Sequence, residues 1–298
     1  MIFSHRTKFF TETDDNIMWM ALVLLYGLLK GAREIVKKKS LQYSSVMEVL
    51  FFYTLFAFVM VLPSVKQALN MKWDLLIWVF AKSCVIFIAW ILSFKAIKKM
   101  PISLYGVLDL SRVLFATLLG SLVLREVMST TQIIGLILVA GGLLLLKVHK
   151  KSPEGEEKVE PLIVFFSLSS CMLNALSGLL DKLLMQSLNS SQLQFWYMLF
   201  LVLLYGGYLF LGKEEVHMKQ AVKNPWIWLL ALLFVIADKA LFIANASPDS
   251  RITVMTLIKQ SGCIVTLMAG KFIYHEKHIL HRAFCTALVV TGIVVAVL

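Results

Sequence analysis

Seven ionisable side chains lie near the middle of long apolar segments of this sequence. Each would cost roughly 2.5–3.5 kcal/mol at the centre of a membrane-inserted helix. Such groups facing lipid would cancel much of the free energy of insertion, so we expect them to face a bundle interior, a wet cavity or one another. Five are basic and two are acidic: Lys30, Lys82, Asp109, Arg112, Asp238, Lys239 and Lys259.

Helical spacing predicts local partners for some of these charges. Asp109 and Arg112 are three residues apart and share one helix face. Lys30 and Glu34 are four residues apart and would do the same. Pairs of this kind could simply neutralise each other and join helices, and that interpretation stays open for both.

Other charges need partners from elsewhere in the chain. Asp238 and Lys239 are adjacent, hence about 100° apart around a helix, and must have separate partners. Asp109 and Asp238 are candidate proton carriers for coupled transport, because burial can lift the pKa of a carboxylate towards neutrality. Asn174 could reach a solute from a stripe of small residues. The excess of buried positive charge suggests that a solute anion is bound by four cations: Lys82, Arg112, Lys239 and Lys259.

Long apolar helices must position these residues. Of the 298 residues, 59% are hydrophobic and 16% charged, and the mean hydropathy is +0.81. About 20 apolar residues cover the ~30 Å hydrocarbon layer as a helix. The sequence therefore predicts an all-α membrane protein with ten transmembrane helices. The apolar blocks are 17–36, 44–62, 74–94, 103–124, 130–147, 161–186, 192–212, 226–244, 252–274 and 280–298.

The blocks form two similar halves. A polar tail (1–16) precedes the first five blocks (17–147), and a polar linker (148–160) separates them from the second five (161–298). Because five is odd, the second half must enter the membrane from the opposite side. The halves are therefore predicted to be inverted repeats around a central cavity, an arrangement that places a solute site near the bilayer midplane.

Matching residues support the repeat. The last two blocks of each half align at an offset of 150 without gaps, so that Ser111 matches Ser261 and Glu126 matches Glu276. We interpret both glutamates as caps of helix N-termini. The same offset places Asp109 opposite Lys259, which predicts either an ion pair between the halves or a clamp for a zwitterion. The first blocks align at an offset of 147, which matches Glu34 with Asp181 and Gly31 with Gly178.

Several classes of function are disfavoured. The net charge of +11 is spread over the connections without a basic tract, which argues against nucleic-acid binding. The four cysteines lie inside apolar blocks and are expected to be buried thiols. No nucleotide-binding loop, hydrolase motif or metal-ligand spacing occurs, so neither an enzyme nor a cofactor is expected.

Several short motifs resemble the EamA domain of the drug/metabolite transporter superfamily. They include Pro101 at the start of the fourth block, Leu124-Arg125-Glu126 at its end and Gly141-Gly142 in the fifth, and Ala269-Gly270-Lys271 and His275-Glu276 in the second half. The resemblance implies ten spans around a central cavity, and ATP-independent transport of small metabolites, often export. It does not carry a substrate with it.

The sequence thus predicts a secondary or facilitative transporter that exports small polar or anionic metabolites, such as amino acids, by alternating access. A carrier or flippase for a phosphate-bearing substrate and a non-transporting scaffold remain alternatives. The expected partners are the lipid bilayer, a small-molecule substrate and, where transport is coupled, protons; a monomer is compatible with the sequence. We expect a multi-pass protein of the cell membrane, and specifically of the bacterial plasma membrane.

Orientation stays open at this point. Most Lys and Arg between blocks lie in the odd-numbered connections, including Lys37-Lys38-Lys39. The positive-inside rule would place these connections in the cytoplasm and both termini outside. The family resemblance implies the reverse.

Overall fold

A computed structural model describes residues 3–124, 129–148, 159–212, 217–246, 255, 258–277 and 279–297, and every regular element among them is a helix. The elements are α1 (Phe3–Ser40), α2 (Val46–Val61), η1 (Leu62–Ser64), α3 (Val65–Ala68), η2 (Trp73–Leu75), α4 (Leu76–Lys99), α5 (Ile102–Asp109), α6 (Ser111–Leu124), α7 (Thr130–Val148), α8 (Pro161–Leu184), α9 (Ser190–Leu211), α10 (Met218–Lys223), α11 (Pro225–Ala246), α13 (Ser261–Phe272) and α14 (Ile279–Val297). Each predicted apolar block falls on one or two of these helices.

Five helical stretches are long and apolar enough to cross a membrane: Val46–Ala68, Trp73–Lys99, Ile102–Gly120, Pro161–Asp181 and Ser190–Leu211. Three shorter apolar helices follow the same pattern at Thr130–Leu145, Ser261–Phe272 and Ile279–Val295. The chain is an all-helical, multi-pass membrane protein.

Local sequence signals set several helix starts. Ser45 and Glu48 form a reciprocal capping box at the start of α2, and Asn189 and Gln192 form another at the start of α9. Pro161 opens α8, where its missing N–H costs no intrahelical bond. These ends place the polar connections outside the apolar bundle.

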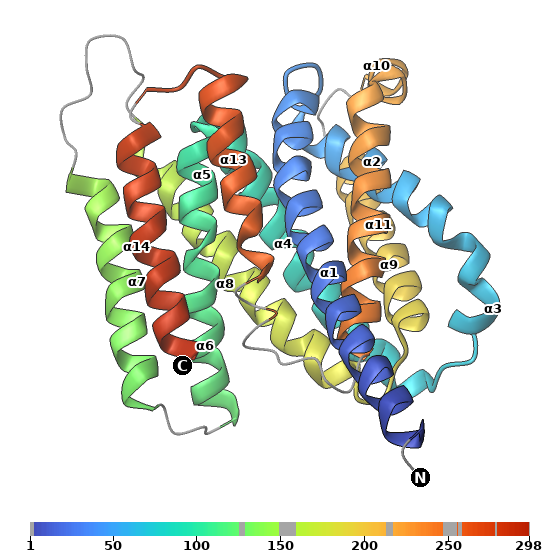
Figure 1. Ribbon diagram of the computed structural model, residues 1–298. Helices are drawn as coiled ribbons and strands as arrows, with labels where there is room; N and C mark the ends of the chain where they lie inside the picture. The colour runs from blue at the N-terminus through green and yellow to red at the C-terminus, as the bar shows by residue number, and fades with distance from the viewer. Residues whose placement is uncertain are drawn as a thin grey trace.

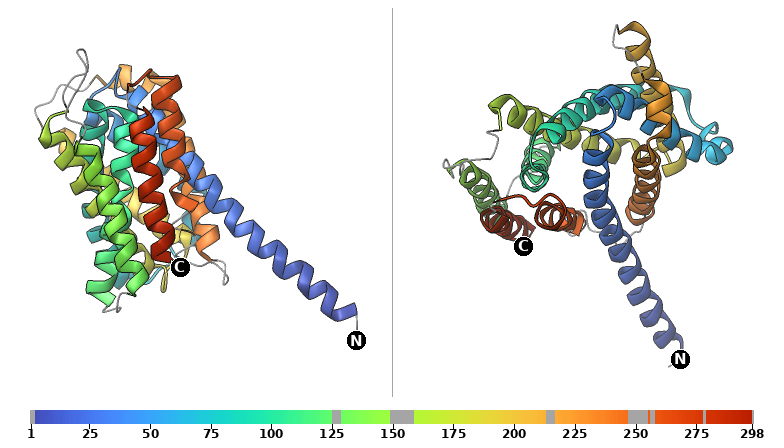
Figure 2. Two further views of the ribbon diagram at one scale, coloured as in Figure 1. Left: turned by 60° about the vertical axis from the view of Figure 1, so that its left-hand side comes forward. Right: turned by 90° about the horizontal axis from the view of Figure 1, so that it is seen from above.

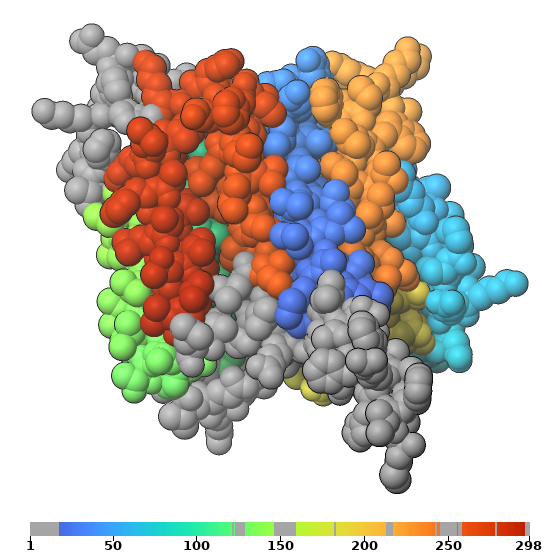
Figure 3. All heavy atoms as spheres, in the orientation of Figure 1, coloured from blue at the N-terminus to red at the C-terminus, as the bar shows by residue number. Residues whose placement is uncertain are grey.

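The helices form one bundle in which neighbours are mostly antiparallel (Figure 1). α1 and α8 run in opposite directions, as do α7 and α14 (Figure 1). The first turns of α1 extend beyond the rest of the bundle (Figure 2). On the face shown in Figure 3, α14, α13, α1 and α11 lie side by side.

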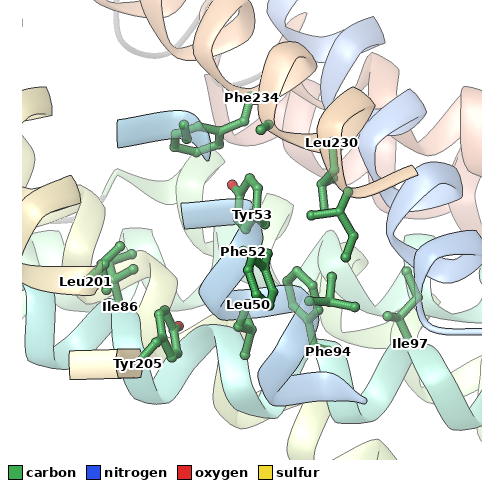
Figure 4. Close-up of a cluster of buried hydrophobic side chains, with 14 of the residues drawn as sticks. Leu50, Phe52, Tyr53, Ile86, Phe94, Ile97, Leu201, Tyr205, Leu230 and Phe234 are labelled. Atoms are coloured by element: carbon green, nitrogen blue, oxygen red, sulfur yellow. The ribbon is translucent and has the colours of Figure 1, made fainter. Parts of the chain in front are cut away.

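The largest hydrophobic core lies where α2, α4, α9 and α11 meet. Tyr53 packs edge-on against Phe234 with 5.4 Å between ring centroids, and Leu50 and Leu201 are fully buried beside them (Figure 4). The Tyr205 hydroxyl donates to the Phe87 carbonyl at 3.2 Å, which satisfies the one polar group of this ring. This core fixes the helices that carry the buried charges.

The fourth block, predicted at 103–124, is one apolar helical stretch over Ile102–Gly120. A tighter turn at Leu110 divides it into α5 and α6: Leu110 keeps right-handed helical dihedral angles, and the Val113 N–H bonds to the Leu110 carbonyl at 3.1 Å. A matching turn lies at Gln260, between helical residues 258–259 and α13. Leu110 and Gln260 are 150 positions apart, so the breaks occupy corresponding places in the two halves.

Candidate functional site

Glycines bring α1 close to α13. A Cβ on Gly31 would lie 2.6 Å from the Gly262 carbonyl oxygen, and a Cβ on Gly262 would lie 2.7 Å from that of Gly27. No larger side chain fits there without moving a helix, so Gly27 and Gly31 let α1 pack closely on α13. This contact lets the neighbouring Lys30 reach into the centre of the bundle.

The centre holds one carboxylate between two cations. Lys30 Nζ lies 2.5 Å from Asp109 Oδ2, and Arg112 Nη2 lies 2.9 Å from Asp109 Oδ1. The side chains of Lys30 and Asp109 are 10% and 11% exposed, whereas that of Arg112 is 29% exposed. The predicted Asp109–Arg112 pair is confirmed.

The predicted Lys30–Glu34 pair is wrong. Lys30 turns across to Asp109 of α5, and Glu34 instead accepts a hydrogen bond from Lys37 Nζ at 2.6 Å. The α1–α13 contact directs Lys30 towards α5. There Arg112 binds the same carboxylate, that of Asp109.

Two more ion pairs join helices from different halves. Lys82 Nζ on α4 lies 3.1 Å from Asp181 Oδ1 on α8. Arg33 Nη1 on α1 lies 3.5 Å from Asp238 Oδ1 on α11. Tyr197 connects the two pairs, as the next contacts show.

The Tyr197 hydroxyl donates to Asp238 Oδ2 at 3.0 Å, and Lys82 Nζ sits 4.1 Å from the centroid of the Tyr197 ring. Asp238, Tyr197, Lys82 and Asp181 therefore form a continuous polar chain through the bundle. Asp238 and Lys239 have separate partners, as predicted, because Lys239 Nζ donates to Ser191 Oγ at 3.3 Å.

Lys259 has no ion-pair partner among the described residues. Its Nζ lies 6.0 Å from the centroid of the Tyr26 ring. It also interacts electrostatically with Lys30, Asp181 and Arg112. The predicted ion pair with Asp109 does not form, because Lys30 and Arg112 occupy both oxygens of that carboxylate.

Asn174 makes a local contact. Its side-chain N–H donates to the Ser170 carbonyl of the same helix at 2.7 Å. Gly178, one turn further along α8, is exposed, and nothing lies within 4 Å of where its Cβ would be. This stripe of α8 is therefore less tightly packed than the corresponding glycine contact on α1.

The cavity at the centre is small. About 10 Å³ remains between α1, α5 and α13, lined by charged and small residues including Lys30, Asp109, Gly262 and Cys263. This is about the room of one water molecule. The halves therefore close on each other here instead of enclosing the wide chamber that the sequence predicts.

A larger, open cavity of about 660 Å³ lies at one end of the bundle, lined by residues that include Lys38, Lys98 and His217. Burial lowers the pKa of the Lys38 ammonium, which donates to the Met100 carbonyl at 2.5 Å.

Three polar atoms near the helix breaks are buried without a hydrogen-bond partner: Ser111 Oγ, Arg112 Nε and Ser261 Oγ. Ser111 opens α6 and Ser261 opens α13, so the two hydroxyls occupy corresponding positions. A buried donor or acceptor without a partner costs about 1–3 kcal/mol.

Glu276 is a helix cap, as predicted, but for a helix of the other half. Its carboxylate accepts from the N–H groups of Ile102 at 2.6 Å and Ser103 at 3.2 Å, at the start of α5. It also binds the Ser103 hydroxyl, and Arg282 Nη1 at 2.9 Å. Glu126 lies outside the described residues, as do Pro153 and Pro248.

Sequence reasoning missed two of the charged residues. Arg33 and Asp181 lie near block ends and were not counted among the mid-membrane charges. The match of Glu34 with Asp181 in the repeat was the signal that could have drawn attention to Asp181. The four cysteines are free, and Cys171, Cys263 and Cys285 are buried, as predicted.

Comparisons with known proteins show a related family and a similar solved structure. Residues 17–148 match the model of the EamA-like transporter family. A solved structure described as "Crystal structure of protein" is 14% identical, with a TM-score of 0.63 and coverage of 93% of this chain and 96% of that chain. At this identity the likeness shows a shared fold alone. No curated protein matches the chain.

Proposed function

Residues 17–148 match the EamA-like transporter family of the drug/metabolite transporter superfamily, and from this premise we propose that the chain is a secondary or facilitative carrier. It exports small polar or anionic metabolites, amino acids among them, by alternating access between two inverted five-helix repeats. The observation that carries the proposal is the central cluster, in which two cations share Asp109 while Lys259 has no ion-pair partner among the described residues.

Packing of the helices supports the repeat. α1 packs on α11 and α13, and α8 packs on α4 and α6, which are the corresponding helices of the other half. α2 packs on α9 and α7 on α14, so each of these two contacts joins a helix to its own counterpart, and the contact of α5 with α13 joins the corresponding blocks 103–124 and 252–274. Since α1 and α8 run oppositely (Figure 1), a twofold axis in the membrane plane would relate the halves.

Broken helices support a solute site at this axis. The turns at Leu110 and Gln260 interrupt corresponding helices, next to Asp109 and Lys259. In carriers built from inverted repeats, discontinuous helices expose backbone groups and helix ends to the solute. Here the interruptions place opposite charges at corresponding points.

The small central cavity fits a closed state of the transport cycle. A metabolite is much larger than the roughly 10 Å³ available, so α1, α5 and α13 must separate for it to enter. The ion pairs Lys82–Asp181 and Arg33–Asp238 join the same helices that would move. Opening to one side requires that some of these ion pairs break and that their side chains bind water or the solute instead.

Protons are the proposed coupling ion where transport is coupled, and Asp238 is the better of the two predicted carriers. Asp238 has one cationic partner and a hydrogen bond from Tyr197. Protonating Asp109 would instead leave two cations without a counter-charge. Purely facilitated transport is the alternative.

Reconstitution in liposomes tests the proposal. Purified protein is assayed for flux of amino acids, sugar phosphates and amines, with and without a pH gradient. We expect saturable, protein-dependent flux, which falls at least tenfold in Arg112→Gln and Lys259→Gln because each loses a charge-assisted contact of about 1.5–3 kcal/mol. Unchanged flux in both variants would overturn the site, and flux equal to that of empty liposomes would favour a scaffold.

A further inference from the structure

The buried charges at the centre do not balance. Three ion pairs are neutral in themselves: Lys37–Glu34, Lys82–Asp181 and Arg33–Asp238. Lys30 and Arg112 share the single carboxylate of Asp109, and Lys259 has no ion-pair partner among the described residues, although Asp181 and Asp238 act on it electrostatically. Among the described residues, the cluster therefore carries an excess of two positive charges.

An excess of this size is costly away from water. An isolated buried ion is strongly destabilised unless it is paired and hydrogen-bonded. Lys30 and Asp109 satisfy each other at 2.5 Å with side chains only 10% and 11% exposed. The uncompensated charges therefore belong to Arg112, whose side chain is 29% exposed, and to Lys259, which has no ion-pair partner among the described residues.

Polar atoms without a hydrogen-bond partner lie on the two segments that carry Arg112 and Lys259. Arg112 Nε is buried without a partner, as are the hydroxyls of Ser111 and Ser261. Lys259 adds an ammonium that contacts only the Tyr26 ring among the described residues. These groups can supply hydrogen bonds to several oxygen atoms of one compact anion.

We propose that the group of the solute that enters this site is doubly negative, a dicarboxylate or a phosphate monoester, and that it lies between Arg112 and Lys259. A dianion neutralises the cluster, whereas a monocarboxylate leaves one charge over and a zwitterion leaves both. The inference rests on the proposed carrier function and narrows its substrates. Ser111 and Ser261 complete the coordination from the corresponding ends of α6 and α13.

Matched probes in the liposome assay separate the charge states. Sulfate, succinate and glycerol phosphate represent the dianions, gluconate the monoanion and alanine the zwitterion. We expect the dianions to be transported at least tenfold faster than gluconate or alanine at pH 7.5. Comparing succinate with glycerol phosphate distinguishes a dicarboxylate carrier from a phosphate-ester carrier.

A pH series provides an internal control. The second pKa of a phosphate monoester is about 6, so acidification to pH 5 converts it to a monoanion, while sulfate stays doubly charged. Flux of glycerol phosphate should fall by about tenfold relative to sulfate over this range. An unchanged ratio would contradict the inference.

Charge variants assign the effect to residues. Lys259→Gln removes one positive charge and should lower the ratio of sulfate to gluconate flux by about tenfold. Lys259→Arg should preserve that ratio. Lys66→Gln removes a charge from an exposed position on α3 and serves as the matched control.

A binding measurement separates the two proposals. The thermal midpoint of the purified protein is compared in sulfate and chloride at equal ionic strength, for the unmodified chain and for Lys259→Gln. Saturable flux that prefers gluconate or alanine overturns the dianion inference and leaves the carrier function standing. A sulfate shift that needs Lys259, without any flux, retains the dianion site and overturns the carrier. Neither flux nor a shift overturns both.

Discussion

Lys82 on α4 pairs with Asp181 on α8, and the corresponding contact between α1 and α11 reverses the signs. There Arg33, the cation, lies on α1, which matches α8 in the predicted repeat, and Asp238, the anion, lies on α11, which matches α4. Each of the two contacts thus joins the first half of the chain to the second through one ion pair.

Removing one member of the Lys82–Asp181 pair should destabilise the protein more than removing both. Lys82→Gln leaves the Asp181 carboxylate without its cation, whereas Lys82→Gln with Asp181→Asn leaves no charge uncompensated. Because the Asp181 side chain is 34% exposed, we expect the single change to cost only about 1–2 kcal/mol. The thermal midpoint in detergent measures both variants, and additive losses would contradict the pairing.

Close packing of α1 on α13 gives a second prediction. Gly262→Ala places a methyl group 2.7 Å from the Gly27 carbonyl oxygen and should cost about 1–3 kcal/mol of stability. Gly178→Ala is the matched control, because Gly178 corresponds to Gly31 yet has open space around its Cβ position. There alanine should be neutral or stabilising by up to about 1 kcal/mol, since it is the better helix former. Equal thermal midpoints for the two variants would show that α1 and α13 do not meet as described.

The cap that Glu276 provides to α5 gives a third prediction. Glu276→Gln keeps the shape but removes the charge that faces the Ile102 and Ser103 N–H groups and the Arg282 guanidinium. We expect a loss of about 1–3 kcal/mol. Glu160→Gln is the control, because Glu160 precedes α8 without a side-chain cap bond. If both variants melt alike, the connection before α14 does not hold the start of α5.

Sequence patterns predicted what depends on neighbours along the chain. The helices follow from apolar blocks of membrane length, and the Asp109–Arg112 pair follows from a spacing of three residues on one helix face. The Lys30–Asp109 pair joins residues 79 positions apart, and only the packing of α1 against its neighbours determines it. The sequence therefore could not assign Asp109 as the partner of Lys30. Glu34 pairs instead with Lys37, three residues away on the same helix.

The helix breaks were also beyond the sequence patterns. Positions 110 and 260 are Leu and Gln, not proline or glycine, so the residue types there do not predict a turn. The interruptions follow from tertiary contacts around the charged centre. Asp181 could have been found, because its repeat counterpart is the acidic Glu34, but it lies near a block end, away from the mid-membrane charges.

Thiol labelling tests whether the central contact opens. Cys263 lines the small cavity and is 6% exposed, so it is sealed in the closed state. In a variant that keeps only Cys263, a water-soluble maleimide should react slowly, and it should react faster under conditions of active exchange, when α1, α5 and α13 separate. A variant that keeps only Cys285, fully buried where α14 packs on α7, is the matched control and should stay unreactive.

A saturating concentration of the transported solute should slow the labelling of Cys263 by occupying the cavity beside it. Labelling of the two cysteines at equal rates would show that the centre does not open selectively, and alternating access through this contact would then be excluded.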